Sequence, residues 1–216
     1  MRYDLVVARL TRLPAELPAP AVSLMPVVLG GGSPRLPARS PAAGASGRPA
    51  AVLVLVYPDE AGVARVVLTE RTTRDGHHSG EVSFPGGKAE PDDADLVATA
   101  LREATEEVGL DPARIGLRVV GLLERFWIPV SDFDVTPVVA LADTRPVLVP
   151  APDEVARIIE PPLAAFLPGA PIEVVERTIR DWALRYGAYC VDGLSVWGAT
   201  ARILSQLGAI VEPRTR

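Results

Sequence analysis

The sequence predicts an α/β fold, a sandwich of helices on a mixed β-sheet. The apolar run 51–57 has the length and the branched side chains of a buried strand. Two longer segments, 95–108 and 194–207, are predicted helices, one in the middle of the chain and one near its end. Shorter apolar runs before, between and after them are typical of further strands, so strands and helices are expected to share a core.

The first 48 residues differ in composition from the rest of the 216-residue chain. Prolines alternate there with Ala, Gly and Ser, and because proline fixes φ and lacks an N–H group, we expect no long elements. Residues 22–29 are expected to form either a short strand or an apolar tether, and residues 30–48 a linker. We therefore predict a proline-rich N-terminal extension over 1–48, also a candidate partner-binding segment, and one domain over 49–212.

The domain is predicted to begin with a β-hairpin. The strand 51–57 is followed by the turn 58–62 and by a second strand over 64–69. The next predicted elements are a polar loop over 71–80, a short strand over 81–84, and a turn at Gly86 and Gly87. A glycine turn is thus expected shortly before the central helix.

The central helix, 95–108, has clear signals at both ends. Asp92, Asp93 and Asp95 lie near its N-terminus, where carboxylates cap free N–H groups and suit the helix dipole. Gly109 is the natural stop, because glycine readily adopts the left-handed conformation that ends many helices. The apolar stripe that should face the core consists of Val97, Leu101, Ala104 and Val108.

The remaining elements follow the central helix. They are strands over 117–124 and 134–142, a short helix over 153–159, strands over 172–178, 183–186 and 188–191, and the final helix 194–207. The strand 134–142 contains Pro137, which cannot donate to a β-ladder. We therefore place this strand at or near an edge of the sheet.

Three glutamates occupy a second face of the central helix. Glu103, Glu106 and Glu107 have the spacing i, i+3 and i+4, which brings their carboxylates together. Like charges this close destabilise a helix unless something neutralises them, and Arg102 offsets only part of their charge. The expected partner is a hard divalent cation, which prefers carboxylate oxygens. The alternative is an ordinary solvated face, which the Arg-Glu pair, the glycine stop and the preceding glycines disfavour.

This segment resembles the Nudix box, whose pattern is G-x5-E-x7-R-E-U-x-E-E-x-G-U, with U an apolar residue. The second half matches in full, at Arg102, Glu103, Ala104, Glu106, Glu107, Gly109 and Leu110. In the first half, the glutamate of the pattern falls on Ala94, between Asp93 and Asp95. Gly87 also lies one residue too far upstream, so the loop carries an insertion and an aspartate is expected to replace that glutamate.

A second resemblance lies just before the box. Residues 68–87 look like the signature L-T-x-R-S…G-x3-F-P-G-G, which marks the Nudix subgroup that cleaves coenzyme A and its derivatives. Residues 80–87 fit fully, whereas Thr72 stands where serine is usual. The resemblance covers about residues 49–210, and the runs that mark relatives cleaving NADH, ADP-ribose or diadenosine polyphosphates are missing.

The resemblance implies a Nudix-type α/β/α sandwich with a mixed β-sheet and a metal-dependent pyrophosphatase. The implied ligands of Mg²⁺ or Mn²⁺ are Glu103, Glu106, Glu107 and the carbonyl oxygen of Gly86. Arg102 would orient a glutamate through a bidentate contact. The general base stays open between a box glutamate and Glu154 on a later loop, and Glu154 has an alternative role as an ordinary residue at a helix start.

The resemblance also implies a substrate-binding region before the box. Its predicted members are Arg71, Arg74, His77, His78 and Ser83. Arginine suits phosphate geometry, and coenzyme A carries a 3′-phosphate and a diphosphate. The alternatives are plain surface charges for the arginines and histidines, and a simple strand position for Ser83.

Bulk properties limit the partners. The formal charge of −5 argues against a nucleic-acid binder, and no apolar run reaches the roughly 18 residues of a membrane span. The start lacks a signal-peptide pattern, and the single cysteine, Cys190, excludes an intrachain disulfide, so we expect a cytoplasmic protein. The resemblance allows a homodimer, because relatives with this fold are often dimers.

The sequence therefore predicts a hydrolase that converts coenzyme A, or a thioester or oxidised form of it, to 3′,5′-ADP and 4′-phosphopantetheine or its acyl form. One rival is a Nudix hydrolase of another nucleoside diphosphate derivative, such as ADP-ribose or NADH. A rival of another class is a non-catalytic module that binds nucleotides or a protein partner. Such modules usually lose box glutamates, whereas the helix trio is intact here.

Overall fold

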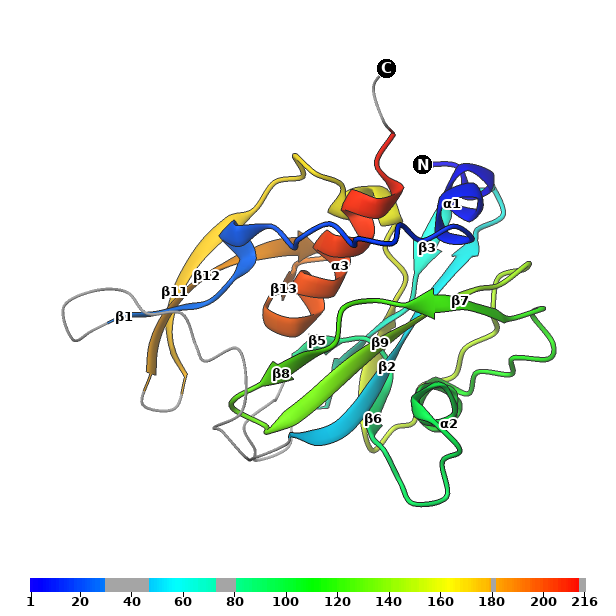
Figure 1. Cartoon of the computed structure of the whole chain (residues 1–216), viewed down its shortest axis with the longest axis horizontal. Coiled ribbons are helices and arrows are strands. Elements are labelled where there is room, and N and C mark those ends of the chain that lie inside the picture. Colours follow the sequence, from blue (N-terminus) through cyan, green and yellow to red (C-terminus); the bar gives the residue numbers. More distant parts are fainter. Residues whose placement is uncertain (30–46, 73–80, 180–181, 214–216) are drawn as a thin grey trace.

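The computed structural model describes residues 1–29, 47–72, 81–179 and 182–213 (Figure 1). Among these residues, six strands form the central sheet, in the order β3-β2-β9-β7 with β6 beside β2 and β8 beside β9. These strands are β2 (Arg48–Pro58), β3 (Ala64–Val66), β6 (Gly86–Lys88), β7 (Arg118–Leu122), β8 (Phe126–Ile128) and β9 (Phe133–Leu141). β2 and β9 run parallel and their other neighbours antiparallel, which confirms the mixed sheet.

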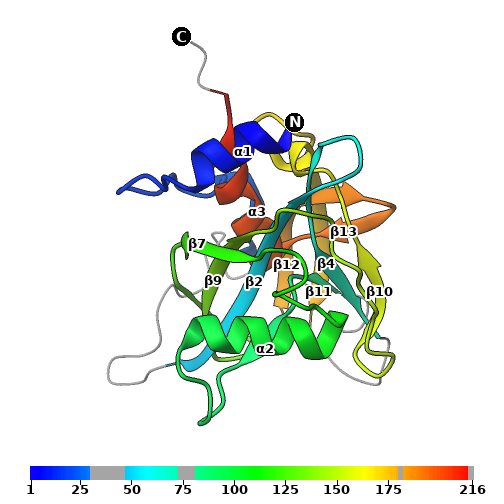
Figure 2. The same cartoon turned by 90° about the vertical axis from the view of Figure 1, so that its right-hand side faces the viewer.

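Helices cover both faces of this sheet. Side chains alternate along β2, so this apolar strand presents a buried face to each side. Leu53 and Leu55 are buried on the face covered by α2 (Leu96–Val108). Val54 and Val56 are buried on the opposite face, beneath α3 (Gly198–Val211) and the short helix η2 (Leu163–Phe166). Figure 2 shows α2 on one side of the sheet and α3 on the other, so the predicted α/β/α sandwich is confirmed.

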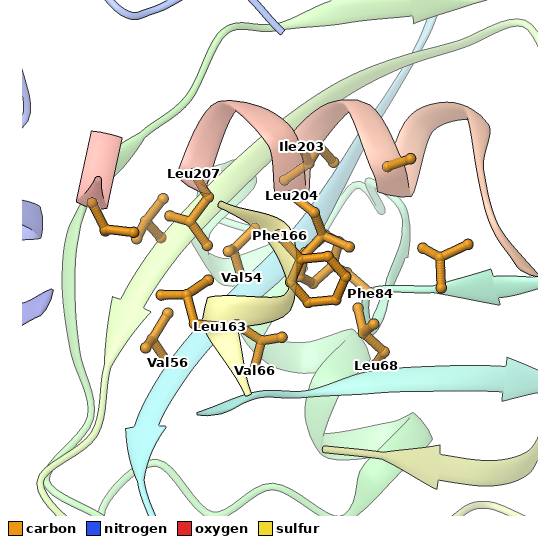
Figure 3. Packing of buried hydrophobic residues seen from close by; sticks show 14 of the residues in the cluster. Val54, Val56, Val66, Leu68, Phe84, Leu163, Phe166, Ile203, Leu204 and Leu207 are labelled. Atoms are coloured by element: carbon orange, nitrogen blue, oxygen red, sulfur yellow. The ribbon is translucent and has the colours of Figure 1, made fainter. Parts of the chain in front are cut away.

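The core beneath α3 is shown in Figure 3. Val54 and Val56 from β2 meet Phe166 from η2 and Leu204 and Leu207 from α3. The helix α1 (Tyr3–Leu10) adds its own buried side chains to this core, Val6 and Leu10, together with Leu24 of the short helix η1 (Val22–Leu24). No helix in the described part of the chain is long and apolar enough to cross a membrane.

The predicted strand 64–69 divides at Val67 into two strands that belong to different sheets. β3 pairs with β2, as expected for the hairpin, whereas β4 (Leu68–Arg71) joins β10 (Val155–Ile159) and β5 (Val82–Ser83). The predicted helix 153–159 is therefore wrong, because its β-branched residues pair with β4 instead of forming a turn of helix. This small sheet brings the start of β10 next to the end of β4.

The strand with Pro137 was predicted at or near an edge of the sheet, and β9 is not the edge strand but lies next to it, between β2 and β7. The carbonyl oxygen of Pro137 accepts from the N–H of Leu123. The N–H and C=O of one strand residue point to the same side. The N–H that proline lacks would therefore point to the segment where β7 has ended and β8 has not begun, and the ladder loses nothing there.

A third sheet projects from the side of the molecule (Figure 1). It contains β1 (Val27–Leu29), β12 (Trp182–Val191), β11 (Glu173–Ile179) and β13 (Leu194–Val196). Neither alternative holds for the whole of residues 22–29, because 22–24 form the short helix η1 and only 27–29 form a strand. The two strands predicted over 183–191 are a single strand. The final helix begins later than predicted, at Gly198, because residues 194–196 pair with β12.

Candidate active site

The helix α2 has the ends that the sequence predicts. The side chain of Asp95 accepts a hydrogen bond from the N–H of Ala98 at 2.8 Å and so caps the N-terminus. Gly109 ends the helix with a φ of 64°. Ala100, Ala104 and Val108 pack into the core below β2. Because these contacts fix the rotation of α2 about its axis, they also fix where its glutamates lie.

The three glutamates differ in exposure. Glu106 is the most exposed, with 58% of its side chain accessible, whereas Glu103 is 16% exposed. Glu107 is buried, at 4% exposure, and its carboxylate accepts from the N–H of Gly86 at 3.2 Å. These three carboxylates, here called the acidic platform, thus range from exposed at Glu106 to buried at Glu107.

Gly86 and Gly87 form the short strand β6 rather than the predicted turn, because they pair with Val52 and Ala51 of β2. A side chain at Gly86 would bring its Cβ to 2.4 Å from the carbonyl oxygen of Ala51. A Cβ at Gly87 would lie 2.4 Å from a carboxylate oxygen of Glu103. Gly86 is therefore required by its close approach to the backbone of β2, whereas a Cβ at Gly87 would displace the carboxylate of Glu103.

Arg102 connects the acidic groups. Its Nε and Nη2 atoms donate to both oxygens of Asp93, each at 3.0 Å. Its Nη1 atom donates to Glu103 and to Glu106, also at 3.0 Å, and Nη2 reaches the carbonyl oxygen of Lys88. Of the two aspartates that flank Ala94, Asp93 is the one that contacts Arg102, and Asp95 caps the helix.

Burial is the main influence on the pKa of two carboxyl groups at the site. Burial raises the pKa of Glu107 to about 7, and the nearby charges of Glu103 and Glu154 act in the same direction. Arg71 and the N–H of Gly86 oppose this shift. Burial also raises the pKa of Glu103, against the hydrogen bond and charge of Arg102. The hydrogen bonds from Arg102 hold the pKa of Asp93 well below its usual range.

Glu154 and Arg71 reach this site from the small sheet β10-β4-β5. Glu154 lies on the turn before β10, and it is close enough for its negative charge to contribute to the raised pKa of both Glu103 and Glu107. Arg71 ends β4, beside Val155. Ser83 pairs with Thr69 in the same sheet, and their hydroxyl oxygens are 3.2 Å apart.

The predicted substrate-binding residues Arg74, His77 and His78 lie outside the described residues. Two contacts at the site were missed by reasoning from the sequence. The carbonyl oxygen of Lys88 helps to hold Arg102, and Thr72 bonds to the turn that carries Glu154. The contact of Lys88 is made by its backbone, so no residue type in the sequence could have indicated it. Thr72, in contrast, stands at the serine position of the signature before the box.

The residues present fit a hard divalent cation. Among the described residues, no three acidic, histidine or cysteine side chains are already gathered as a metal site. Their oxygens are turned to other partners, because Glu103 and Glu106 share Arg102 and Glu107 accepts from Gly86. The donor set is nevertheless all oxygen, as Mg²⁺ and Mn²⁺ prefer, and a cation would favour the charged form of Glu107, whose pKa is raised mainly by burial and less by the charges of Glu103 and Glu154.

The chain is similar to known proteins over most of its length. The family model described as "NUDIX domain" matches residues 47–173. "Nudix hydrolase 15, mitochondrial" of Arabidopsis thaliana is 37% identical over 171 residues, which cover 76% of this chain and 59% of that protein. The "Uncharacterized Nudix hydrolase NudL" of Salmonella newport is 38% identical over 166 residues, which cover 74% of this chain and 81% of that protein.

Among solved structures, a Nudix hydrolase from M. smegmatis, RenU, has a TM-score of 0.47 and 25% identity, and the match covers 59% of this chain and 80% of that one. This chain spans less than two thirds of the length of the Arabidopsis relatives that it matches. The family model nevertheless covers more than half of the chain, and the NudL relative is matched over most of its length. On this evidence the chain belongs to the Nudix family.

Proposed function

We propose that this protein is a metal-dependent pyrophosphohydrolase that cleaves the diphosphate of coenzyme A or a derivative to 3′,5′-ADP and 4′-phosphopantetheine or its acyl form. The observation that carries this proposal is the acidic platform of α2. Glu103 and Glu107 lie against the glycine strand β6, and Glu106 joins Glu103 at Arg102. A set of carboxylates held in this way suits a reaction that needs a cation beside an anionic substrate.

The proposed roles follow from these contacts. Mg²⁺ or Mn²⁺ held by Glu103, Glu106, Glu107 and the Gly86 carbonyl oxygen would neutralise the diphosphate and make a bound water more acidic. Arg102 keeps two of these carboxylates in place, and Asp93 keeps Arg102 in place. Arginine makes such paired contacts with a fixed geometry, so the platform is preorganised.

The chemical step needs a base. The oxygen of a water molecule would attack one phosphorus, the anhydride P–O bond would break, and the proton of the water would pass to a carboxylate. We assign this carboxylate to Glu154, with a box glutamate as the alternative. Glu154 is exposed and lies close to Glu103 and Glu107, which supports the assignment.

The coenzyme A class rests on the residues before the box. The charge of Arg71 is near enough to Glu107 to oppose the rise of its pKa, so a guanidinium group lies beside the acidic platform. Arginine at this position suits a phosphate group of the substrate. Ser83, in the adjacent strand, and Arg74, His77 and His78, which follow Arg71, complete the proposed substrate-binding set. We further propose a cytoplasmic enzyme and a homodimer, on the single cysteine and on the resemblance respectively.

A product assay tests this function. The purified protein is incubated separately with coenzyme A, NADH, ADP-ribose and diadenosine tetraphosphate, with Mg²⁺ or Mn²⁺, and the products are separated by ion exchange. We expect preferential release of 3′,5′-ADP from coenzyme A. Turnover of another substrate alone would retain pyrophosphatase chemistry and reject the coenzyme A class. No cleavage of any substrate would favour a nucleotide-binding module.

Replacing Asp93 with asparagine is expected to lower kcat by about 10- to 100-fold, the range for a residue that orients a metal ligand. The substitution removes the charge that pairs with Arg102 through both of its oxygens, so the arginine is free to leave Glu103 and Glu106. The matched control is Asp92→Asn, because Asp92 is the exposed neighbour on the same loop. Equal rates for both variants in steady-state assays would show that the Asp93–Arg102 pair does not support catalysis.

A further inference from the structure

We propose that Thr72 is a positioning residue that holds the turn carrying Glu154 against the acidic platform. This inference rests on the proposed function, in which Glu154 takes a proton from water. Thr72 directly follows β4, and its two polar groups both reach the turn. Its N–H donates to the carbonyl oxygen of Glu154 at 3.0 Å, and its hydroxyl donates to the carbonyl oxygen of Asp153 at 3.2 Å.

The turn is fixed at a second point by α2. The N–H of Ala151 donates to the carbonyl oxygen of Glu107 at 2.8 Å. The carbonyl oxygen of Ala151 in turn accepts from the N–H groups of Glu154 and Val155, at 3.0 and 2.8 Å. Hydrogen bonds therefore hold residues 151–155 on two sides. One side is α2, which carries the box glutamates, and the other is the end of β4, where Arg71 and Thr72 lie.

Regular β-pairing does not hold Glu154 by itself. The ladder between β4 and β10 is irregular between Val155 and Arg157, and its last pair joins Val155 to Arg71. Glu154 lies beyond that pair with an exposed side chain. In the described part of the chain, no hydrogen bond fixes its carboxylate, so the position of that carboxylate depends on the backbone of the turn. Thr72 supplies the bonds that continue the pairing for one more residue.

This arrangement also explains the chemical type at position 72. Serine and threonine both carry the hydroxyl that the Asp153 carbonyl oxygen accepts, whereas valine has the shape of threonine without a donor. Thr72→Ser should therefore keep the turn in place, and Thr72→Val should release it. The bond from the backbone N–H to Glu154 survives in both variants, so the fold is expected to survive as well.

The kinetic test compares Thr72→Val and Thr72→Ser in wild-type and Glu154→Gln backgrounds, with coenzyme A as substrate. We expect Thr72→Val to lower kcat about 10-fold with little change in KM, because a small misplacement of a reacting group is costly. Thr72→Ser is expected to retain wild-type kcat. In the Glu154→Gln background, Thr72→Val should cost nothing further, because both changes disable the same group. A full 10-fold loss in both backgrounds would overturn the inference.

A second measurement does not depend on catalysis. Amide hydrogen exchange of residues 151–156 is expected to be about two- to tenfold faster in Thr72→Val, the ratio expected when one hydrogen bond is lost. The matched control is Thr11→Val, which removes a comparable bond from the Thr11 hydroxyl to the Val7 carbonyl oxygen at the end of α1. Unchanged exchange in Thr72→Val would refute the positioning role. If the wild-type protein cleaves nothing, the proposed function fails, and this exchange result still decides whether Thr72 holds the turn.

Discussion

Replacing Glu107 with glutamine is expected to abolish most activity and, at the same time, to stabilise the metal-free protein. The loss of kcat should be about 10²- to 10³-fold, the range found when one group that stabilises transition-state charge is removed. Glutamine keeps the size of the side chain and an oxygen for the N–H of Gly86, so the packing around it should not change. The negative charge alone is lost, and that charge is buried.

The gain in stability should depend on pH. Burial raises the pKa of Glu107 from its ordinary 4.5 to about 7 in the folded protein, so the folded state binds more protons than the unfolded state between these values. The free energy of unfolding of the wild type should therefore fall as pH rises from about 4.5 to about 7, by about 3 kcal/mol at most. Glu107→Gln removes this penalty, so its advantage should be small near pH 4.5 and full at pH 8.

Thermal unfolding with and without Mg²⁺ checks both parts. In chelator at pH 8, Glu107→Gln should have a higher Tm than the wild type, and added Mg²⁺ should raise the Tm of the wild type more than that of the variant. Glu173→Gln, at an exposed position on β11, is the control for loss of one negative charge. A variant that remains fully active would contradict the metal role of Glu107. A lower Tm at pH 8 would contradict an unfavourable buried charge.

Replacing Gly208 with alanine is expected to cost about 2–3 kcal/mol of unfolding free energy. A Cβ at this position of α3 would lie only 2.0 Å from the carbonyl oxygen of Phe166, which is part of the η2 backbone. Phe166 is fully buried beneath α3 (Figure 3). Its ring meets the ring of Tyr189 edge-on, with centroids 5.2 Å apart, so η2 has little room to retreat. Overpacking of this kind outweighs the roughly 1 kcal/mol by which alanine favours a helix over glycine.

Urea unfolding followed by far-UV circular dichroism measures this cost. The control is Gly62→Ala, because a Cβ at Gly62 meets nothing within 4 Å and only its φ of 73° disfavours alanine. That strain should cost about 1–2 kcal/mol without any steric overlap. If Gly208→Ala unfolds at the wild-type midpoint, α3 must be able to shift over η2, and the close contact would not be a constraint on the fold.

Elements of the fold with local causes were predictable. The bounds of α2 follow from Asp95 and Gly109, whose capping chemistry depends only on their neighbours in sequence. The identity of β10 was not predictable in this way, because a short run of five residues becomes a strand only through its pairing with β4. That β9 has neighbours on both sides likewise depends on the gap between β7 and β8 opposite Pro137, a tertiary feature without a local signal.

The same division applies to the candidate site. The three box glutamates lie within one helix, so their spacing alone predicts a common face. Which of Asp93 and Asp95 contacts Arg102 depends on the path of the preceding loop, and the spacing in the sequence could not predict it. Thr72 and Glu154 are far apart in the sequence, and only the pairing of β4 with β10 brings them together.

The buried side chains of α1 and α3 affect how the protein should be trimmed for laboratory work. The family model ends at residue 173 and begins at 47, so a fragment cut at those limits lacks both helices. Val56 and Phe166 would then lose the cover that Val6, Leu10 and Leu207 give to their core. Such a fragment would present a broad apolar surface to water and would be prone to self-association. The segment that the family model matches is shorter than the segment that closes this core.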